Sequence, residues 1–421
     1  MVIICSLIPV VFWYFAVPLK FRFLNLSATL TSLGQITGLV GMAMFALTFI
    51  LSSRIGGLED YFGGMNKAYV AHHIFGGVSF ILLLIHPLLL AGSYIPLSLK
   101  SAADMLLPST NWQVNLGITA LLFMMSMLIF TFFVNLPYEV WRFTHKFLGV
   151  AFFFGGLHAF FIPSDMSRYL YVRIYMLTLI GIGLAGYLYR TVLGRFLVKR
   201  YTYIVKKVNQ LNPQTLDVVM APQKKPLHFA PGQFVYISFK KRKLQETHPF
   251  SILSPPENSD MALGLKTVGD FTNEMKNLKP GTLVRVEGPF GRFTYSLFNN
   301  YQQIWIAGGI GITPFISMAK SISDLKYKIN FYILARDVEE MVYLRDAVLS
   351  EARFPNLNVI PHYSSLNGRL TATLIQEKSG LLLDKDIFMC GPPPMMYALK
   401  KQFRALGLKS SHIHSEEFQM L

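Results

Sequence analysis

Two apolar stretches of this chain carry histidines, and these residues have the type and spacing best suited to chemistry. One stretch, AHHIFGGVSFILLLIHPLLL, covers 71–90, and the other, THKFLGVAFFFGGLHAFF, covers 144–161. Their histidines are His72, His73, His86, His145 and His158. An imidazole is costly in hydrocarbon, so histidines inside apolar helices long enough for a membrane predict a functional site.

The spacing of these histidines predicts two stacked haems. Histidines 13 or 14 positions apart on one helix lie roughly 20 Å apart along its axis. That separation fits one haem towards each face of a hydrocarbon core about 30 Å thick. Two helices that each supply one ligand to each iron would hold two b-type haems, with the ligands His72, His86, His145 and His158. The alternative is that each histidine hydrogen-bonds a neighbouring helix.

Helical phase decides between His72 and His73. At about 100° per residue, the 14-residue step from His72 to His86 returns within about 40° of the same face. A short echo, HIFGGV against HKFLGV, favours His73 instead. We choose His72, because phase follows from helix geometry and a six-residue echo can arise by chance.

The second histidine pair is out of phase on an ideal helix. The 13-residue step from His145 to His158 misses the starting face by about 140°. We therefore expect helix tilt, or a distortion near Gly155 and Gly156, to bring the two imidazoles onto one side.

Composition indicates a membrane protein with a basic surface. The chain has 421 residues, 52% of them hydrophobic, and a formal net charge of +16. The apolar excess lies in the first half, and the basic residues form no single patch with interleaved aromatics. Contact with the bilayer surface and with anionic cofactors is therefore expected, and a nucleic-acid partner is not. Cys5 and Cys390 lie far apart, which excludes a disulfide framework and a cysteine metal cluster.

Six apolar segments fit a bilayer. They cover 2–19, 30–52, 69–92, 114–134, 144–163 and 169–190. The first has neither a positive n-region nor a small-residue cleavage site, so we expect a retained membrane helix rather than a removed signal peptide. Basic residues follow the last segment, at Arg190, Arg195, Lys199, Arg200, Lys206 and Lys207. They predict a multi-pass protein of the cell membrane whose second half is cytoplasmic.

This orientation assigns the histidines and the other basic residues to sides. His72 and His145 would share the inner haem, and His86 and His158 the outer one. Four inner residues could hold haem propionates or be ordinary positive-inside residues: Arg54, Lys67, Arg142 and Lys146. Five others could form a basic outer mouth: Lys20, Arg22, Lys100, Arg168 and Arg173.

The chain changes character near residue 200. Short alternating runs with Pro and Gly turns predict a small antiparallel β-barrel to about residue 297. From Gln303 the pattern alternates strand and helix, which predicts a doubly wound α/β domain with a parallel sheet. The predicted fold is thus an all-α six-helix haem bundle over 1–195, a β-barrel over 200–297 and a Rossmann-like α/β domain over 298–421.

Two motifs of the barrel suit a flavin. His248, Pro249, Phe250 and Ser251 follow a strand, where a hydroxyl and backbone amides can hold the ring edge and the ribityl chain. Downstream, 266–272 reads KTVGDFT and offers a strand end, a glycine and a helix start. That arrangement is expected to bind a pyrophosphate at a helix N-terminus.

Two motifs of the α/β domain suit a dinucleotide. AGGIGITP at 307–314 lies between a strand and a helix, so Gly308, Gly309 and Gly311 can let the backbone approach a phosphate. CGPPPM at 390–395 ends a later strand, near the edge where a nicotinamide is expected. Cys390 could also be only a small buried filler.

These motifs, in this order, resemble the ferredoxin-NADP reductase superfamily, and the preceding membrane half makes the chain look like a bacterial NADPH oxidase or ferric reductase. The resemblance implies FAD, two b-type haems and NADPH or NADH as cofactors. It implies FAD contacts at His248, Pro249, Phe250, Ser251, Lys266, Gly269, Phe271 and Thr272. It implies dinucleotide contacts at Gly308, Gly309, Gly311, Thr313, Pro314 and Gly391.

The resemblance also implies roles for four further residues. Cys390 would lie near the hydride path, and Phe418 would stack on the flavin. Arg336, or alternatively Arg369, would meet the 2′-phosphate of NADPH.

The activity implied is electron transfer from cytosolic NADPH through FAD and two haems to extracellular O2, forming superoxide. Ferric-chelate reduction, or electron donation to a partner protein, is the alternative. A proton- or voltage-sensing membrane protein is a different class, and the reductase motifs argue against it. Nothing in the sequence indicates an activation segment, so no obligatory protein partner is expected.

Overall fold

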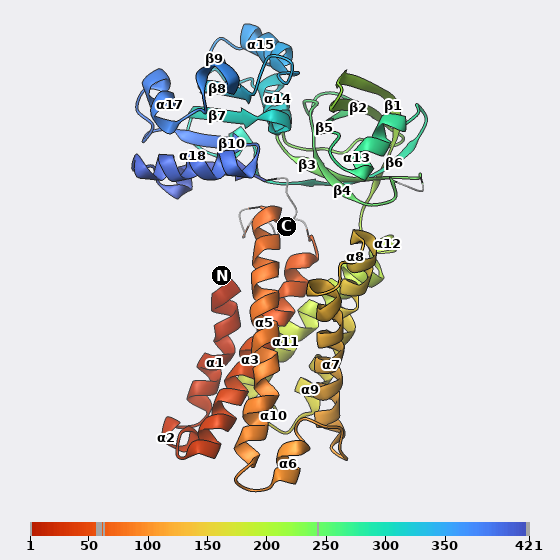
Figure 1. Ribbon diagram of the computed structural model, residues 1–421, viewed down its shortest axis with the longest axis vertical. Helices are drawn as coiled ribbons and strands as arrows, with labels where there is room; N and C mark the ends of the chain where they lie inside the picture. Colours follow the sequence, from red (N-terminus) through yellow and green to blue (C-terminus); the bar gives the residue numbers. More distant parts are fainter. Residues whose placement is uncertain (1, 56–60, 62–63, 242–243, 418–421) are drawn as a thin grey trace. The chain divides into compact units, whose positions relative to one another are not determined.

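The computed structural model describes residues 2–55, 61, 64–241 and 244–417. The chain divides into two compact units, one of Met1–Leu58 with Lys67–Val198 and one of Glu59–Asn66 with Lys199–Leu421. The first is helical, and the second contains two β-sheets with their helices (Figure 1).

The first unit is built from long apolar helices joined by short ones. Its helices are α1 (Val2–Ala16), α2 (Leu19–Arg22), α3 (Leu26–Ser52), α5 (Met65–Tyr94), α6 (Leu99–Ala103), α7 (Trp112–Phe132), α8 (Tyr138–Lys146), α9 (Leu148–Phe161), α10 (Asp165–Arg168), α11 (Leu170–Tyr187) and α12 (Gly194–Leu197). Side-chain caps start two of the long helices, because Asn25 accepts from the Ala28 amide and Asn111 from the Val114 amide.

Four of the described helices are long and apolar enough to cross a membrane. They cover Leu26–Ser52, Lys67–Tyr94, Trp112–Phe132 and Leu170–Val192. The other two predicted segments contain shorter apolar helices, α1 with 15 residues and α9 with 14. The structure therefore contains four helices suited to a membrane among the described residues, and the count of six crossings stays a prediction.

The exposed apolar side chains of α5 recur at helical spacing, as expected for a face turned to lipid. They are Ile74, Val78, Ile81, Ile85 and Leu88. Because the backbone polar groups of a helix are satisfied internally, such a face can lie in hydrocarbon at no hydrogen-bonding cost.

Close packing inside this unit depends on small residues. α3 packs along α11, and α7 along α9. A Cβ at Gly183 would lie 3.0 Å from the Phe152 ring, and Phe152 itself stacks on Phe49 at 4.7 Å between centroids. Glycines that let helices approach are a usual packing device of membrane bundles.

The distortion expected near Gly155 and Gly156 lies elsewhere. α9 runs through both glycines, and the interruption is at Phe147, between α8 and α9. There the Phe147 amide donates a hydrogen bond to the Thr144 carbonyl, and the Val150 amide donates one to the Phe147 carbonyl. In both bonds the acceptor lies three residues before the donor, not four as in an α-helix. A 3₁₀ turn rotates the chain by about 120° per residue, compared with about 100° in an α-helix. The extra rotation turns His158 towards the face of His145.

Arg22 is part of a buried ion pair rather than of an open basic mouth. Its guanidinium lies 2.7 Å from the Asp165 carboxylate and 3.7 Å from the centre of the Trp13 ring. The side chain of Arg22 is only 4% exposed. The expectation that Arg22 is part of a basic outer mouth is therefore wrong, because its side chain is buried and Asp165 neutralises it.

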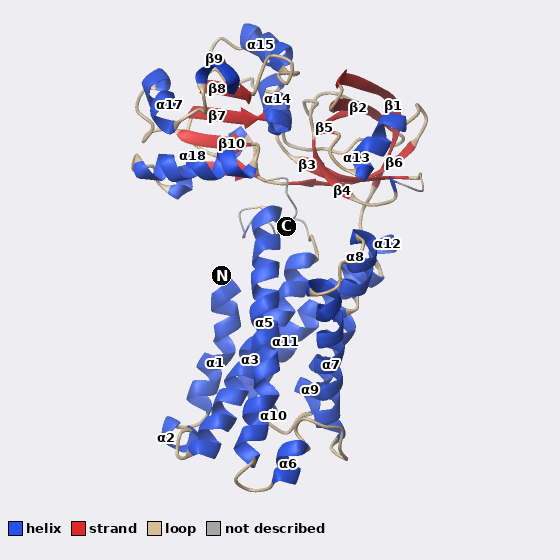
Figure 2. Cartoon of the chain, in the orientation of Figure 1, coloured by secondary structure: helices blue, strands red, loops and turns tan. Residues whose placement is uncertain are grey.

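The second unit begins with a curled antiparallel sheet (Figure 2). Its strands are β1 (Tyr201–Asn212), β2 (Thr215–Pro222), β3 (Phe234–Phe239), β4 (His248–Ser251), β5 (Met261–Lys266) and β6 (Leu283–Phe290), in the order β4-β3-β6-β1-β2-β5. A bridge between Ile252 and Leu263 links the ends of the outer strands, so the sheet curls towards a barrel. The short helix α13 (Asp270–Glu274) packs its Phe271 into the core of this sheet.

A parallel sheet follows, with its helices on the two faces. Its strands are β7 (Gln302–Gly308), β8 (Lys328–Ala335), β9 (Leu357–Tyr363), β10 (Asp386–Cys390) and β11 (Ile413–Glu416), in the order β11-β10-β7-β8-β9. The helices are α14 (Thr313–Lys320), α15 (Leu344–Arg353), α16 (Ser364–Asn367), α17 (Ala372–Ser379) and α18 (Pro393–Ala405). Strands buried on both sides explain the near-continuous apolar runs of the sequence.

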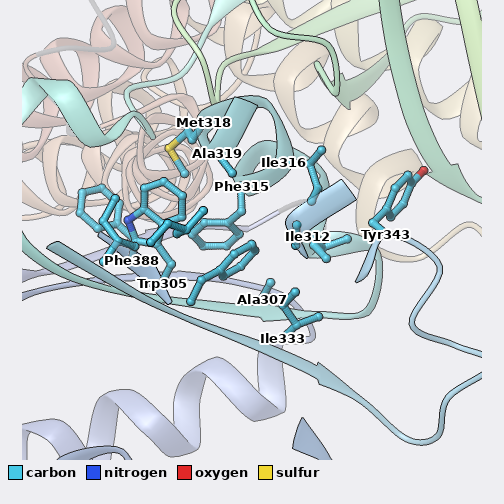
Figure 3. Close-up of a cluster of buried hydrophobic side chains, with 14 of the residues drawn as sticks. Trp305, Ala307, Ile312, Phe315, Ile316, Met318, Ala319, Ile333, Tyr343 and Phe388 are labelled. Atoms are coloured by element: carbon cyan, nitrogen blue, oxygen red, sulfur yellow. The ribbon is translucent and has the colours of Figure 1, made fainter. Parts of the chain in front are cut away.

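One face of the parallel sheet carries a dense aromatic core. Trp305 and Phe315 are fully buried and lie 5.7 Å apart between ring centroids (Figure 3). Phe388 joins the same cluster from β10. This core fixes α14 on the sheet, and α14 begins directly after the glycine-rich turn.

Candidate redox sites

Three of the predicted ligand histidines hydrogen-bond to backbone carbonyls of neighbouring helices. His72 Nδ1 donates to the Thr48 carbonyl at 2.9 Å. His86 Nδ1 donates to the Gly34 carbonyl at 2.6 Å, and His158 Nδ1 donates to the Gln113 carbonyl at 2.7 Å. A carbonyl can only accept, so the proton of each neutral imidazole is on Nδ1 and the Nε2 lone pair is left for a metal. Metal-binding histidines usually have such a partner.

His72 and His145 face each other across a gap that suits one metal ion. Their ring centroids are 6.2 Å apart with an interplanar angle of 64°. Two imidazoles on opposite sides of one metal, each with a bond of about 2 Å, place their ring centres roughly 6 Å apart. His73 is exposed, whereas His72 is partly buried. The geometry therefore favours His72 over its neighbour as the ligand.

His145 differs from the other three because its Nδ1 is buried without a hydrogen-bond partner among the described residues. Trp141 stacks on its ring at 5.3 Å. Unlike the other three, His145 therefore has no described carbonyl that fixes which of its ring nitrogens carries the proton. The described residues contain no group of three or more His, Cys, Asp or Glu that could hold a metal ion, which leaves paired histidines as the candidates.

His86 and His158 form the second pair, and each lies further along the chain on the same two segments. The two imidazoles lie within electrostatic range of each other. The residues present thus fit two haems, each of which would be held by one imidazole from α5 and one from the α8–α9 segment. Ligation by two histidines leaves no open position at the iron.

The flavin candidates gather at one edge of the curled sheet. His248, Pro249, Phe250 and Ser251 form β4, an edge strand that pairs only with β3 in the sheet order. The His248 ring lies 4.0 Å from Phe271, and Phe250 stacks on Phe271 at 6.2 Å. The structure therefore brings the HPFS and GDFT motifs together, although they are about 20 residues apart in the sequence.

The expected pyrophosphate position has a local hydrogen-bond network. Thr272 Oγ1 accepts from the amides of Val268 and Gly269, both at 3.1 Å. Lys266, at the end of β5, is exposed near this turn. The Thr272 hydroxyl thus holds the turn in shape, and its predicted contact with FAD stays a prediction.

The dinucleotide candidates meet where β7 and β10 end. A Cβ at Gly311 would lie 2.5 Å from the Cys390 carbonyl oxygen, and one at Gly308 would lie 2.7 Å from Met395 Sδ. These glycines, together with Gly391, let the two loops pack tightly. Gly309 differs, because its φ is +54° and the space at its Cβ is open. Thr313 and Pro314 are buried at the start of α14.

Cys390 is completely buried at the end of β10, in register with Ala307 and Glu416. Burial raises the pKa of its thiol well above the usual value, and Glu416 and Glu417 add to the effect. The thiol therefore stays protonated at neutral pH. Its predicted place near the hydride path stays a prediction.

The candidates for the 2′-phosphate lie beyond β8. Arg336 is exposed, and its carbonyl accepts from the Ser365 amide at 3.1 Å. That bond brings the turn containing the exposed Arg369 near the end of β8. Phe418, the predicted flavin-stacking aromatic, lies outside the described residues.

Three partners of the histidines were missed from the sequence. The carbonyls of Thr48, Gly34 and Gln113 hold the imidazoles, and a backbone carbonyl carries no residue-type signal. Trp141, four residues before His145, could have been noticed from its helical spacing.

Comparisons with known proteins assign families to three consecutive parts of the chain. Residues 37–156 match the ferric reductase-like transmembrane component, 200–293 an FAD-binding domain, and 305–401 an oxidoreductase NAD-binding domain. The chain has the domain arrangement of the NADPH oxidases. Its second half therefore contains an FAD-binding domain followed by an oxidoreductase NAD-binding domain.

Curated relatives agree at low identity. NADPH oxidase 1 of Rattus norvegicus is 24% identical over 269 residues, which cover 52% of this chain and 47% of that protein. A superoxide-generating NADPH oxidase heavy chain of Dictyostelium discoideum is 24% identical, over 63% of this chain and 54% of that protein. The reductase component of the glycine betaine monooxygenase of Pseudomonas aeruginosa is 28% identical, over 53% of this chain and 64% of that protein.

The chain thus spans about half to two thirds of the length of these relatives. Among solved structures, flavohemoglobin from Malassezia yamatoensis, with bound FAD and heme, matches with a TM-score of 0.54 at 16% identity. The match covers 93% of this chain and 98% of that one, and it concerns the fold alone.

Proposed function

We propose that this protein carries electrons from NADPH, by way of FAD and two b-type haems, across a membrane to O2. One NADPH supplies two electrons, which reduce two O2 molecules to two superoxide ions and release one proton with NADP+. The observation that carries the proposal is the facing pair His72 and His145, 6.2 Å apart in a ferric reductase-like half that precedes FAD- and NAD-binding domains.

The chain's own residues have three tasks in this reaction. The loops that end β7 and β10 bind and orient the dinucleotide, and β4 with α13 binds the flavin. The four histidines would hold the two haems inside the apolar helices. When bound, FAD divides the electron pair of NADPH into single electrons, and bis-histidine haems carry single electrons.

We place the protein in the cell membrane with its FAD and NAD domains in the cytoplasm. The support is the positive-inside rule, because basic residues follow α11 at Arg190, Arg195, Lys199 and Arg200. Arg336 and Arg369 support NADPH over NADH, since a guanidinium can pair with a 2′-phosphate. We expect turnover without an added protein partner.

The test is aerobic, NADPH-driven cytochrome c reduction by the purified, FAD- and haem-loaded protein, with and without superoxide dismutase. Strong inhibition by the dismutase is the expected result, because it means that superoxide carries the electrons. A rate that the dismutase does not change would contradict O2 as the acceptor.

Ferric-chelate reduction is the second candidate, favoured by the ferric reductase-like description of the matching transmembrane family. An anaerobic assay with ferric chelates separates the two. Reduction of chelates at the rate of NADPH oxidation, together with no effect of the dismutase in air, would replace the first proposal by the second.

A further inference from the structure

Two helices that supply no predicted haem ligand, α3 and α7, accept hydrogen bonds from His86 and His158 in the same way. α3 offers the Gly34 carbonyl to His86, and α7 offers the Gln113 carbonyl to His158. In an α-helix the carbonyl of residue i points towards residue i+4. A ring that bonds this carbonyl from outside the helix must therefore lie over residue i+4.

Residue i+4 is a glycine in both helices. A Cβ at Gly38 would lie 2.6 Å from His86 Nδ1 and 2.7 Å from Cε1. A Cβ at Gly117 would lie 2.9 Å from His158 Nδ1 and 3.0 Å from Cε1. Real side chains essentially never come so close, so each imidazole occupies the space that any other residue at these positions would fill.

His72 and His145 do not have this combination of a short carbonyl hydrogen bond and a glycine four residues later. His72 bonds the Thr48 carbonyl at the longer distance of 2.9 Å, and the residue four positions on is Ser52. His145 has no hydrogen-bond partner for Nδ1 among the described residues. The two pairs of histidines therefore differ in how firmly their rings are held.

We propose that Gly38 and Gly117 are positioning residues for one haem, the one bound by His86 and His158. Each glycine, with the carbonyl four residues before it, forms a seat that fixes the ring orientation and the tautomer of one axial ligand. This inference rests on the proposed haem-binding function and adds residues that set the geometry of one of the two centres.

A carbonyl hydrogen bond to Nδ1–H also makes the imidazole a stronger donor to its metal. Both ligands of this haem have a short bond of that kind, whereas the pair His72 and His145 has one longer bond. Disturbing either seat should therefore change the spectrum and the midpoint potential of one haem and leave the other unchanged.

The test compares Gly38→Ala and Gly117→Ala with a matched control, Gly41→Ala. Gly41 lies on the same helix as Gly38, and its Cβ would come within 2.9 Å of Leu83 on α5. The control therefore introduces the same methyl group against the same helix without touching an imidazole. The readouts are haem per protein, the low-spin ferric EPR signals and an equilibrium redox titration.

The wild-type protein should contain two haems with two low-spin signals. Gly38→Ala and Gly117→Ala should each lose one haem, or shift one signal and its potential, and the affected signal should be the same in both. Gly41→Ala should keep both signals. NADPH-driven flavin reduction should persist in all three variants, which shows that the dehydrogenase half is folded.

A double variant excludes a general packing effect. In the His86→Ala background there is no ring to displace, so adding Gly38→Ala should leave the haem content and protein yield unchanged. A further loss there, unchanged spectra in both single variants, or an equal loss in Gly41→Ala would overturn the proposal. A wild-type protein without haem would instead contradict the proposed function itself.

Discussion

At the scale of single residues, neighbouring histidines with different surroundings give a direct test of ligand assignment. His72→Ala and His158→Ala should each remove one haem and abolish acceptor reduction, because each deletes one axial imidazole. NADPH-driven flavin reduction should continue in both. Haem content, acceptor reduction and anaerobic flavin bleaching are the measurements.

The control for this prediction is His73→Ala. His73 is exposed on α5, next to His72 on the chain. It should keep both haems and its activity. Loss of a haem in His73→Ala, with retention in His72→Ala, would reverse the assignment that helical phase suggested.

The thiol of Cys390 should be inert in the folded protein. Burial first, and then Glu416 and Glu417, raise its pKa above the usual value of 9.0. Since the thiolate is the reactive form, iodoacetamide at pH 8 should label Cys390 only after unfolding. Peptide mass analysis checks this, with the less buried Cys5 as the internal comparison. Rapid labelling of Cys390 in the folded protein would disagree with its burial.

At the scale of elements, the loops after β7 and β10 depend on glycine for contact with each other. Gly311→Ala would place a methyl group 2.5 to 2.7 Å from the backbone of Cys390 and Gly391. Backbone cannot rotate away as a side chain can, so overpacking of about 1–3 kcal/mol is expected. The KM for NADPH should rise, while FAD and haem content remain.

Gly269→Ala is a suitable comparison, because nothing lies within 4 Å of its Cβ and its φ is −122°. It tests a glycine of the predicted flavin motif without steric conflict inside the protein. If it raises the KM for NADPH as much as Gly311→Ala does, the loop contact is not the cause.

The elements show which features could be read from the sequence. Hydrophobic runs and turn residues predicted a helical membrane half, an antiparallel sheet and a parallel sheet, because each has its own period. The interruption at Phe147 was placed wrongly near Gly155 and Gly156. The two glycines were the predicted place of a distortion, whereas the hydrogen bonds at Phe147 join backbone groups three residues apart and carry no distinctive residue type.

The candidate sites were predictable to a similar degree. Residue type and spacing identified the histidines and the glycine-rich loops. Their partners were not identifiable, because backbone carbonyls and the contact of Gly311 with Cys390 arise only when distant segments pack. Arg22 was misjudged for the same reason, since Asp165 lies 143 positions away along the chain.

At the scale of the whole molecule, two hydrogen bonds join the antiparallel-sheet part of the second unit to its parallel-sheet part. Tyr343 donates a short hydrogen bond to Asp217 on β2, and Ser317 donates to the Ser254 carbonyl at 2.8 Å. Burial raises the pKa of Asp217 above its ordinary 3.8, although the bond from Tyr343 lowers it in part. Burial outweighs the hydrogen bond, so the folded protein favours the protonated form of Asp217 more than the unfolded chain does.

The raised pKa of Asp217 makes the stability of the folded protein depend on pH. Between the ordinary and the raised pKa the folded protein binds more protons than the unfolded chain, so stability falls as pH rises through that window. Asp217→Asn keeps an acceptor for Tyr343 and removes the charge. It should raise the unfolding temperature at pH 7, and the difference should vanish towards pH 3.8. A lower unfolding temperature at pH 7 would mean that the charge itself stabilises the contact.

Transmembrane electron transfer makes a prediction that belongs to the membrane as a whole. Each electron that crosses leaves positive charge behind, and moving one charge against 100 mV costs about 2.3 kcal/mol. NADPH oxidation by the protein in sealed vesicles, with the NAD domain outside and an acceptor trapped within, should therefore slow as the potential grows. Valinomycin with potassium should restore the rate, and it should have no effect on the protein in detergent. If valinomycin does not change the rate in vesicles, electrons leave the protein on the side where they enter. That result would exclude the two proposed haems as the route of the electrons.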